Sequence, residues 1–315
     1  MRKVIGTDEA GYGPNLGPLV IAATKWQLPD DVDDMRKALQ DVVVEIAGNP
    51  DDSRIEVADS KQLYTRGHGL ARLERAVAAF AALNGGAAKS FTEFVLDDCS
   101  CQLDCLDDLY CSINQFSFPQ EVAAEQVGRD AERLGRQMEK CGIQFQQLAV
   151  RVVFPDRFNR LLDRRENKAN LLSQETLCLV AELMDPGESH QILCDKHGGR
   201  SRYLGLIQHC LTLNPARIEC EGRQRSAYHW QDSNEDNSIE FVAGGEFHLP
   251  IALASMAAKY VREQFMNAWN SFWLQQIPQL KPTAGYPVDA RRFKADIAQK
   301  QVELGIEDSQ IWRLK

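Results

Sequence analysis

Two adjacent acids, Asp8 and Glu9, end a short apolar segment near the start of the chain. Residues 3–8 have the composition of a β-strand, and Gly11 interrupts the strand directly afterwards. Neighbouring side chains of a strand point to opposite faces, but at such a break both carboxylates can approach one centre. Because like charges at close range raise each other's pKa, an oxygen-preferring divalent cation is a common way to keep both groups ionised.

Two further acids stand at comparable positions. Asp195 ends the strand-like segment 192–195, and Glu246 follows two glycines just before an Ala-rich segment. Ligands of α/β sheets gather beyond the strand ends, so these acids are candidates for the same centre as Asp8 and Glu9. Carboxylates without histidine or thiol partners favour Mg²⁺ or Mn²⁺ over zinc, and such a cluster suits phosphoryl transfer with two metal ions.

The elements that must position these acids follow from hydrophobic periodicity and turn residues. Strands are predicted at 3–8, 19–26, 91–96, 148–154 and 192–195, and a hairpin is predicted from 217–230 and 239–243. Helices are predicted at 30–46, 70–83, 121–141, 167–184, 250–273 and 288–303, with a loop at 58–62. Strands that alternate with helices predict an α/β layer structure.

Composition gives the chain the profile of a globular protein: 315 residues, of which 44% are hydrophobic and 26% charged. No run of eighteen apolar residues occurs, and acids follow Met1 too soon for a signal-peptide core, so we expect a cytoplasmic protein.

The net charge of −9, taken alone, argues against a nucleic-acid partner, because binding phosphates requires cations. The charge is unevenly distributed, however. Residues 90–128 contain eight acids and no Lys or Arg, which leaves 36 basic against 37 acidic residues elsewhere. The remainder of the chain can therefore carry a local basic face.

The chain has nine cysteines, and an odd number cannot all pair in a disulfide framework. We therefore expect reduced thiols. Four of them, Cys99, Cys101, Cys105 and Cys111, lie in the acidic stretch. Their spacing lacks paired C-x2-C arms, so the motif for zinc is weak. Both a zinc site and an acidic insertion at about 97–141 with small buried side chains fit this pattern.

Several segments resemble the type 2 ribonucleases H, the ribonuclease HII and HIII group. Residues 5–14, Ile-Gly-Thr-Asp-Glu-Ala-Gly-Tyr-Gly-Pro, resemble that family's D-E-A-G-R-G-P signature, and 59–63, Asp-Ser-Lys-Gln-Leu, are similar to its D-S-K-K-L. Residues 154–156 with 167–170, the helix at 251–260 and Gly-Tyr-Pro at 285–287 also match in order. The resemblance spans most of the chain apart from about 97–141 and 217–237.

The resemblance implies a ribonuclease H-like fold, with a mixed central sheet flanked by helices in residues 1–280 and a C-terminal helical extension at 281–315. It also implies metal-dependent cleavage of the RNA strand in RNA–DNA hybrids, or at ribonucleotides embedded in DNA, leaving 5′-phosphate and 3′-hydroxyl ends. Asp8, Glu9 and Asp195 would be catalytic and metal-binding. Strict spacing puts the family's fourth acid at Gly245, and we assign it to the neighbouring Glu246.

Substrate contacts are implied by the same motifs. Gly11, Tyr12 and Gly13 would form a turn whose backbone approaches the ribose and senses its 2′-hydroxyl. The Tyr286 ring would pack on the neighbouring sugar. Ser60 and Lys61 would contact phosphate.

Two departures from the family pattern concern substrate choice. Tyr12 replaces the family's arginine, and the basic segment 196–202 follows Asp195 where the family has Gly-Asn. Lys196, Arg200 and Arg202 are candidate replacements for the missing cation as phosphate contacts.

Two other functions fit the same sequence. One is a catalytically silent nucleic-acid-binding homologue whose acidic insertion contacts a protein partner. The other is a nuclease of the same fold that acts on branched or structured DNA. The sequence specifies neither the oligomeric state nor the length of RNA required.

Overall fold

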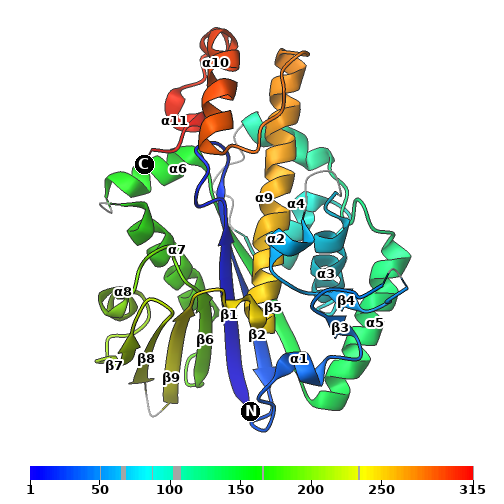
Figure 1. Cartoon of the computed structure of the whole chain (residues 1–315), viewed down its shortest axis with the longest axis vertical. Coiled ribbons are helices and arrows are strands. Elements are labelled where there is room, and N and C mark those ends of the chain that lie inside the picture. Colours follow the sequence, from blue (N-terminus) through cyan, green and yellow to red (C-terminus); the bar gives the residue numbers. More distant parts are fainter. Residues whose placement is uncertain are drawn as a thin grey trace.

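The structure is a computed structural model that describes residues 1–49, 51–64, 69–86, 88–101, 108–164, 167–232 and 235–314. A seven-stranded mixed sheet in the order β5-β2-β1-β6-β9-β8-β7 is flanked by helices, as Figure 1 shows. The α/β class and the mixed central sheet predicted from the sequence are confirmed.

The strands of the large sheet are β1 (Arg2–Ala10), β2 (Leu19–Leu28), β5 (Gln144–Val153), β6 (His190–Asp195), β7 (Arg217–Glu221), β8 (Arg225–Asp232) and β9 (Glu235–Val242). β1 runs parallel to β6, and β6 runs parallel to β9, whereas the other neighbours are antiparallel. A separate two-stranded sheet joins β3 (Val43–Val44) and β4 (Ile55–Glu56). The predicted hairpin is present as β8 and β9, with β7 added at the edge.

The helices are α1 (Met35–Ala38), α2 (Ser60–Leu63), α3 (Ala71–Ala82), α4 (Phe91–Glu93), α5 (Ala124–Cys141), α6 (Pro155–Asp163), α7 (Lys168–Leu183), α8 (Leu204–Cys210), α9 (Leu249–Gln276), α10 (Pro287–Glu303) and α11 (Asp308–Ile311). A π-helical segment, η1 (Phe94–Asp98), and two 3-10 segments, η2 (Asp108–Gln115) and η3 (Gly245–Phe247), complete them. The predicted helices at 70–83, 121–141, 167–184, 250–273 and 288–303 are confirmed. No helix in these described ranges is both long and apolar enough to cross a membrane.

Three sequence predictions of local structure are wrong. The helix at 30–46 shrinks to α1, which Asp34 caps, because the β-branched residues after it pair as β3. The strand at 91–96 is helical, since Ser90 and Glu93 form a capping box. The loop at 58–62 contains α2, which begins where the Asp59 carboxylate accepts the Lys61 amide.

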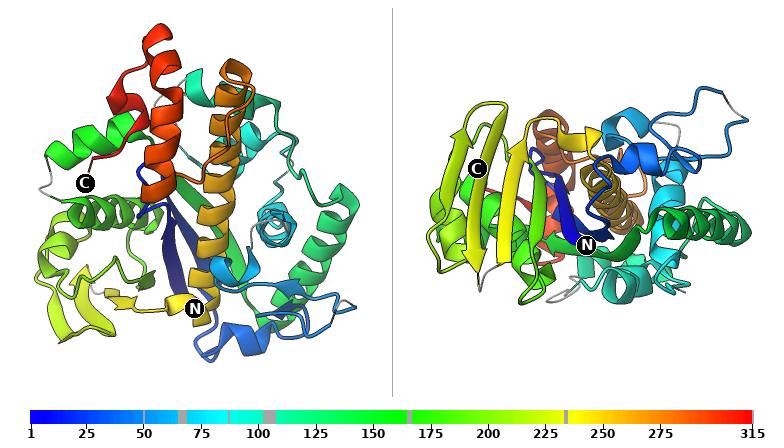
Figure 2. Two further views of the ribbon diagram at one scale, coloured as in Figure 1. Left: turned by 45° about the horizontal axis from the view of Figure 1, so that its top comes forward. Right: turned by 90° about the horizontal axis from the view of Figure 1, so that it is seen from below.

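The sheet separates two hydrophobic cores. Alternation along β1 sends Val4 to the core beneath α9 and α3, and Ile5 to the core beneath α6 and α7. Figure 2 shows α9 lying along one face of β1 and β2. Gly6 permits a close approach of β1 to α9, because a Cβ at this position would stand 2.4 Å from the Pro250 carbonyl carbon at the start of α9. The Thr24 hydroxyl donates to the Pro250 carbonyl at 2.8 Å.

The acidic insertion is attached to this scaffold through a buried acid. The Glu74 carboxylate of α3 accepts the backbone N–H groups of Gln120, Glu121 and Val122 at 2.8, 2.6 and 2.8 Å. The Tyr260 hydroxyl of α9 donates to the same carboxylate at 2.7 Å. Four hydrogen bonds to one carboxylate therefore fix the insertion against the long helix.

The cysteines of the insertion lie in different environments. Cys99 and Cys101 are buried, and burial raises the pKa of the Cys99 thiol well above its ordinary value. Cys111 is exposed, and Cys105 lies outside the described residues. The zinc hypothesis for these four cysteines stays untested.

Candidate active site

Parallel pairing of β1 and β6 brings the first acids together. Thr7 is the register partner of Cys194, so Asp8 and Asp195 are the next residues on the two strands. Asp8 is 8% exposed, and Glu9 follows it before β1 ends at Ala10. The acids that the sequence places at strand ends therefore lie at the same end of two neighbouring central strands.

Glu246 joins them from the short segment η3. The Gly245 amide donates to an Asp195 carboxylate oxygen at 3.0 Å, which holds η3 against the end of β6. Gly244 has a φ of +66°, in the region that glycine tolerates best, so the chain can turn there between β9 and η3. Glu246 is thus placed beside the acids, while Gly245 supports Asp195 through its backbone.

The four carboxylates form one electrostatic cluster. Burial, followed by repulsion from Asp195, raises the pKa of Asp8 to about 8 from 3.8. Burial and then Asp8 raise the pKa of Glu9 well above its usual value. Burial is also the main cause of the raised pKa values of Asp195 and Glu246, and Asp195 adds to the rise at Glu246. Burial, with repulsion between neighbouring acids at Asp8, Glu9 and Glu246, thus disfavours the ionised carboxylates and leaves the site short of positive charge.

This deficit fits a divalent cation. The donors are all carboxylate oxygens, which hard ions such as Mg²⁺ and Mn²⁺ prefer. Within the described ranges, however, no three Asp, Glu, His or Cys side chains are close enough to hold one ion. Electrostatic repulsion acts over several ångströms, whereas coordination requires contact, so the acids would have to move closer around a bound metal.

Lys61 is a cation that acts on several of these acids: it lowers the pKa values of Glu9, Asp195 and Glu246. It follows Asp59 on α2 and is exposed. Burial lowers the pKa of its ammonium, but Asp59, Asp8, Glu246 and Asp195 together raise it above 10.5. Lys61 therefore stays charged at the rim of the cluster and can meet an anionic ligand.

Ser60 has a different environment from the one predicted. It is buried, and its hydroxyl lies 3.0 Å from that of Ser255 on α9. Ser255 in turn hydrogen-bonds the Asp8 carboxylate and lowers its pKa. Ser60 is thus placed behind Asp8 in a hydroxyl chain and away from solvent, which corrects its assignment as a phosphate contact.

The glycine turn, residues 11–17, follows the acids. Gly11 has a φ of +90°, and a Cβ there would stand 2.5 Å from the Arg262 side chain, so only glycine fits. Gly13 is exposed, and the space around it is open. Gly11 and Gly13 therefore present backbone rather than side chains on either side of Tyr12.

Tyr12 stands between an acid and a pair of cations. Burial and then Glu9 raise the pKa of its hydroxyl, while Arg200 lowers it. The Lys168 ammonium lies 4.8 Å from the centre of the Tyr12 ring. The Arg200 guanidinium hydrogen-bonds the Asn170 side chain on the same helix as Lys168. Tyr12 thus lies near Arg200 and Lys168 in the fold.

Tyr286 is adjacent to the same turn. The carbonyl oxygen of Gly285 accepts the amides of Asn15 and Leu16 at 2.8 and 3.3 Å. Tyr286 is 51% exposed and is the N-cap of α10. It is therefore available to a ligand that lies over the glycine turn.

Lys196 is a correction to the predicted phosphate contacts. Its ammonium is buried and donates to the Arg200 carbonyl, the Gly222 carbonyl and the Ser226 hydroxyl at 3.1, 2.7 and 3.0 Å. These three acceptors use all of its protons, so it cannot bind phosphate without breaking them. Arg202, in contrast, is 89% exposed.

Sequence reasoning missed residues that shape the site without being acids or glycines. Lys168 was within a matching motif, and that position was a usable signal. Ser255 has no local signal, because a serine in an Ala-rich helix is ordinary. Arg36 donates to the carbonyl oxygens of Val57, Glu246 and Phe247 at 2.8, 2.8 and 2.6 Å, and only the tertiary structure brings these together.

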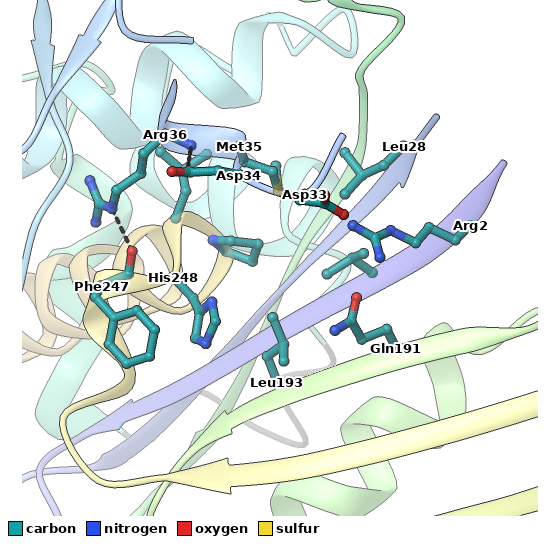
Figure 3. A pocket seen from close by; sticks show the side chains of 13 residues that line it. Arg2, Leu28, Asp33, Asp34, Met35, Arg36, Gln191, Leu193, Phe247 and His248 are labelled. Atoms are coloured by element: carbon teal, nitrogen blue, oxygen red, sulfur yellow. Dashed lines mark hydrogen bonds between the residues drawn. The ribbon is translucent and has the colours of Figure 1, made fainter. Parts of the chain in front are cut away.

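A cavity of about 510 Å³ lies behind η3, at the start of α9. Figure 3 shows Arg2, Gln191 and His248 around it, with Arg36 bonded to the Phe247 carbonyl. Its lining contains none of the four clustered acids.

Comparison with known proteins gives structural matches only. No protein-family model matches this chain. No curated protein matches it by sequence.

Solved structures of type 2 ribonucleases H are similar to it over nearly its whole length. The ribonuclease H2 from Pyrococcus horikoshii OT3 is 16% identical, with a TM-score of 0.48, over 98% of this chain and 92% of that one. The RNase HII in a PCNA complex from Archaeoglobus fulgidus is 14% identical, with a TM-score of 0.40, over 99% and 96%. Bst-RNase HIII in complex with Mn²⁺ is 17% identical, with a TM-score of 0.40, over 99% and 66%.

Proposed function

We propose that this protein is a metal-dependent endonuclease that cleaves the RNA strand of RNA–DNA hybrids, or DNA at embedded ribonucleotides. The observation that carries the proposal is the cluster of Asp8, Glu9, Asp195 and Glu246, which strand pairing and the Gly245–Asp195 hydrogen bond bring together and whose ionised forms a bound cation would stabilise. The motifs that resemble type 2 ribonucleases H point to the same reaction. Products would carry 5′-phosphate and 3′-hydroxyl ends.

The four acids would hold Mg²⁺ or Mn²⁺, and the bound metal would supply an activated water and stabilise the leaving oxygen. The other residues would bind and orient the substrate. Lys61, Lys168 and Arg200 offer cations for phosphates around the acids. The exposed Gly13 backbone and the Tyr286 ring would meet the ribose.

The test is cleavage of a fluorescent RNA–DNA hybrid with Mg²⁺ or Mn²⁺. Asp8→Asn and Asp195→Asn should each lower the rate by about 10³-fold or more while hybrid binding persists, because metal ligands are lost. Asp41→Asn is the matched control, since Asp41 is exposed and acts on Arg54 instead of the cluster.

Other substrates distinguish the proposed function from the two alternative functions. A protein that binds hybrids but cleaves none would be a silent homologue. Cleavage of an all-DNA junction without cleavage of the hybrid would identify a structured-DNA nuclease. Full activity of both Asp→Asn variants would refute the acidic cluster as the centre.

A further inference from the structure

The glycine turn is hydrogen-bonded to a segment that lies almost 300 residues later in the chain. This segment, residues 311–314, is here termed the strap. Trp312 pairs with Leu16 in an antiparallel bridge, and the Arg313 amide donates to the Asn15 carbonyl at 2.8 Å. Figure 1 shows the turn between β1 and β2 meeting α6, α10 and α11 at one end of the molecule.

Arg313 makes the most specific contacts of the strap. Its Nη2 group donates to the carbonyl oxygen of Gly11 at 2.6 Å and to that of Pro14. Gly11 and Pro14 bracket the exposed part of the turn, so one guanidinium group fixes both of its ends.

The direction of these carbonyls determines the direction of the amides. In a planar trans peptide the C=O and N–H bonds point to opposite sides. The Pro14 carbonyl faces Arg313, and the next amide, that of Asn15, accordingly donates to Gly285 on the other side. By the same geometry the Gly11 carbonyl faces Arg313 and the Tyr12 N–H points away from it. Outside the helices and strands, no backbone carbonyl of the described residues accepts the Tyr12 amide, and this N–H points to the side of the turn opposite Arg313.

The strap is itself anchored. The Asn159 side chain on α6 donates to the Trp312 carbonyl at 2.9 Å and accepts the Leu314 amide at 2.8 Å. The Arg313 guanidinium lies 5.0 Å from the Phe158 ring centre. The strap thus connects the turn to α6 rather than ending in solvent.

The environment of the Arg313 guanidinium is unfavourable for a charged group. It is 1% exposed, its Nε and Nη1 groups have no hydrogen-bond partner, and no carboxylate of the described ranges lies within ion-pair distance of it. Burial, and then the nearby Arg262, lower the pKa of Arg313 to about 9. A buried cation without an acid costs folding free energy, so a stabilising role alone does not explain it.

We propose that Arg313 is a positioning residue: it holds the Gly11 and Pro14 carbonyls inward so that the backbone N–H of the turn faces the sugar of the bound strand. This inference rests on the proposed function, since it assigns the turn to substrate recognition. Loss of Arg313 frees the turn without removing any metal ligand. Loss of Arg313 should therefore weaken sugar recognition and leave metal binding intact.

The test compares Arg313→Met, which removes every donor, with Arg313→Lys, which retains the charge and a single donor nitrogen for the carbonyls. Arg291→Met is the matched control, because Arg291 is an exposed arginine of α10. Hydrogen exchange of amides in residues 11–17 should become at least about tenfold faster in Arg313→Met, with partial rescue in Arg313→Lys and no change in the control. This readout does not depend on activity.

Kinetics and metal binding complete the test. Arg313→Met should lower kcat/KM for the hybrid by about 10- to 100-fold and reduce the preference for ribose over deoxyribose, because a displaced turn misaligns the substrate. Affinity for Mn²⁺ should stay within about twofold, since the acids remain in place.

Other outcomes overturn specific claims. Unchanged exchange in the turn, or Mn²⁺ affinity that falls together with the hybrid cleavage, would refute a positioning role for Arg313. If Arg313→Met does not fold, exchange in Arg313→Lys decides the same question. If the wild-type protein cleaves no hybrid, the proposed function fails, whereas faster exchange in Arg313→Met would still show that the strap orders the turn.

Discussion

Replacing Asp8 by asparagine should make the metal-free protein more stable. Burial and Asp195 raise the pKa of the Asp8 carboxyl from 3.8 to about 8. A group whose folded-state pKa is raised binds its proton more tightly when folded, so it lowers stability as pH rises from about 4 to about 8. The asparagine variant has no such charge to bury.

The size of the effect follows from that pKa. At pH 7 the difference from 3.8 is about 3 units, which sets a ceiling of about 4 kcal/mol on the free energy recovered. Four carboxylates share the repulsion, and the asparagine weakens the hydrogen bonds from Ser255 and the Glu9 amide. We therefore expect a gain of about 1–3 kcal/mol at pH 7.

Urea denaturation in EDTA at pH 5, 7 and 8.5 measures this gain, with Asp41→Asn as the control. The difference between Asp8→Asn and wild type should grow from pH 5 to pH 8.5. Adding Mn²⁺ should stabilise the wild type by mass action and leave Asp8→Asn almost unaffected. An asparagine variant less stable than wild type at pH 8.5 in EDTA would refute the reasoning about the cluster.

Three further predictions concern other parts of the molecule. Arg36→Met should lower hybrid cleavage by about tenfold or more at unchanged hybrid affinity, because the guanidinium holds the backbone of Glu246; unchanged kcat would exclude this role. Tyr286→Ala should reduce discrimination between ribose and deoxyribose in competition cleavage, and equal selectivity would remove the ring from recognition. Glu74→Ala should lower the free energy of unfolding by about 2–4 kcal/mol, measured by urea denaturation, because three backbone amides and the buried Tyr260 hydroxyl lose their acceptor; a loss under 1 kcal/mol would contradict this.

The acids show which features of the candidate site can be predicted from local sequence patterns. Asp8 and Asp195 each end a buried strand, and parallel pairing of such strands places their last residues together. The glycines before Glu246 and the helix after it made this residue a candidate, and its role as the fourth acid stays a prediction. The strand ends and most long helices depend on neighbours in sequence, so the sequence predicted them, whereas the pairing that brings Asp8 and Asp195 together joins segments far apart in the chain.

Ser60 and Lys196 show where local pattern fails. Both stand next to residues of the site and carry groups suited to phosphate, yet both are buried and hydrogen-bonded within the protein. Their partners, Ser255, Gly222 and Ser226, lie on other elements. No spacing in the sequence distinguishes a rim cation from a buried one.

The sequence by itself determined which acidic residues end strands and which glycine-containing turn follows the first of them. Only the tertiary structure decided which groups support them. Arg36 and Arg313 bind backbone carbonyls far away in the chain. Every residue has a carbonyl group, so such contacts leave no side-chain signature and exist only once the chain has folded.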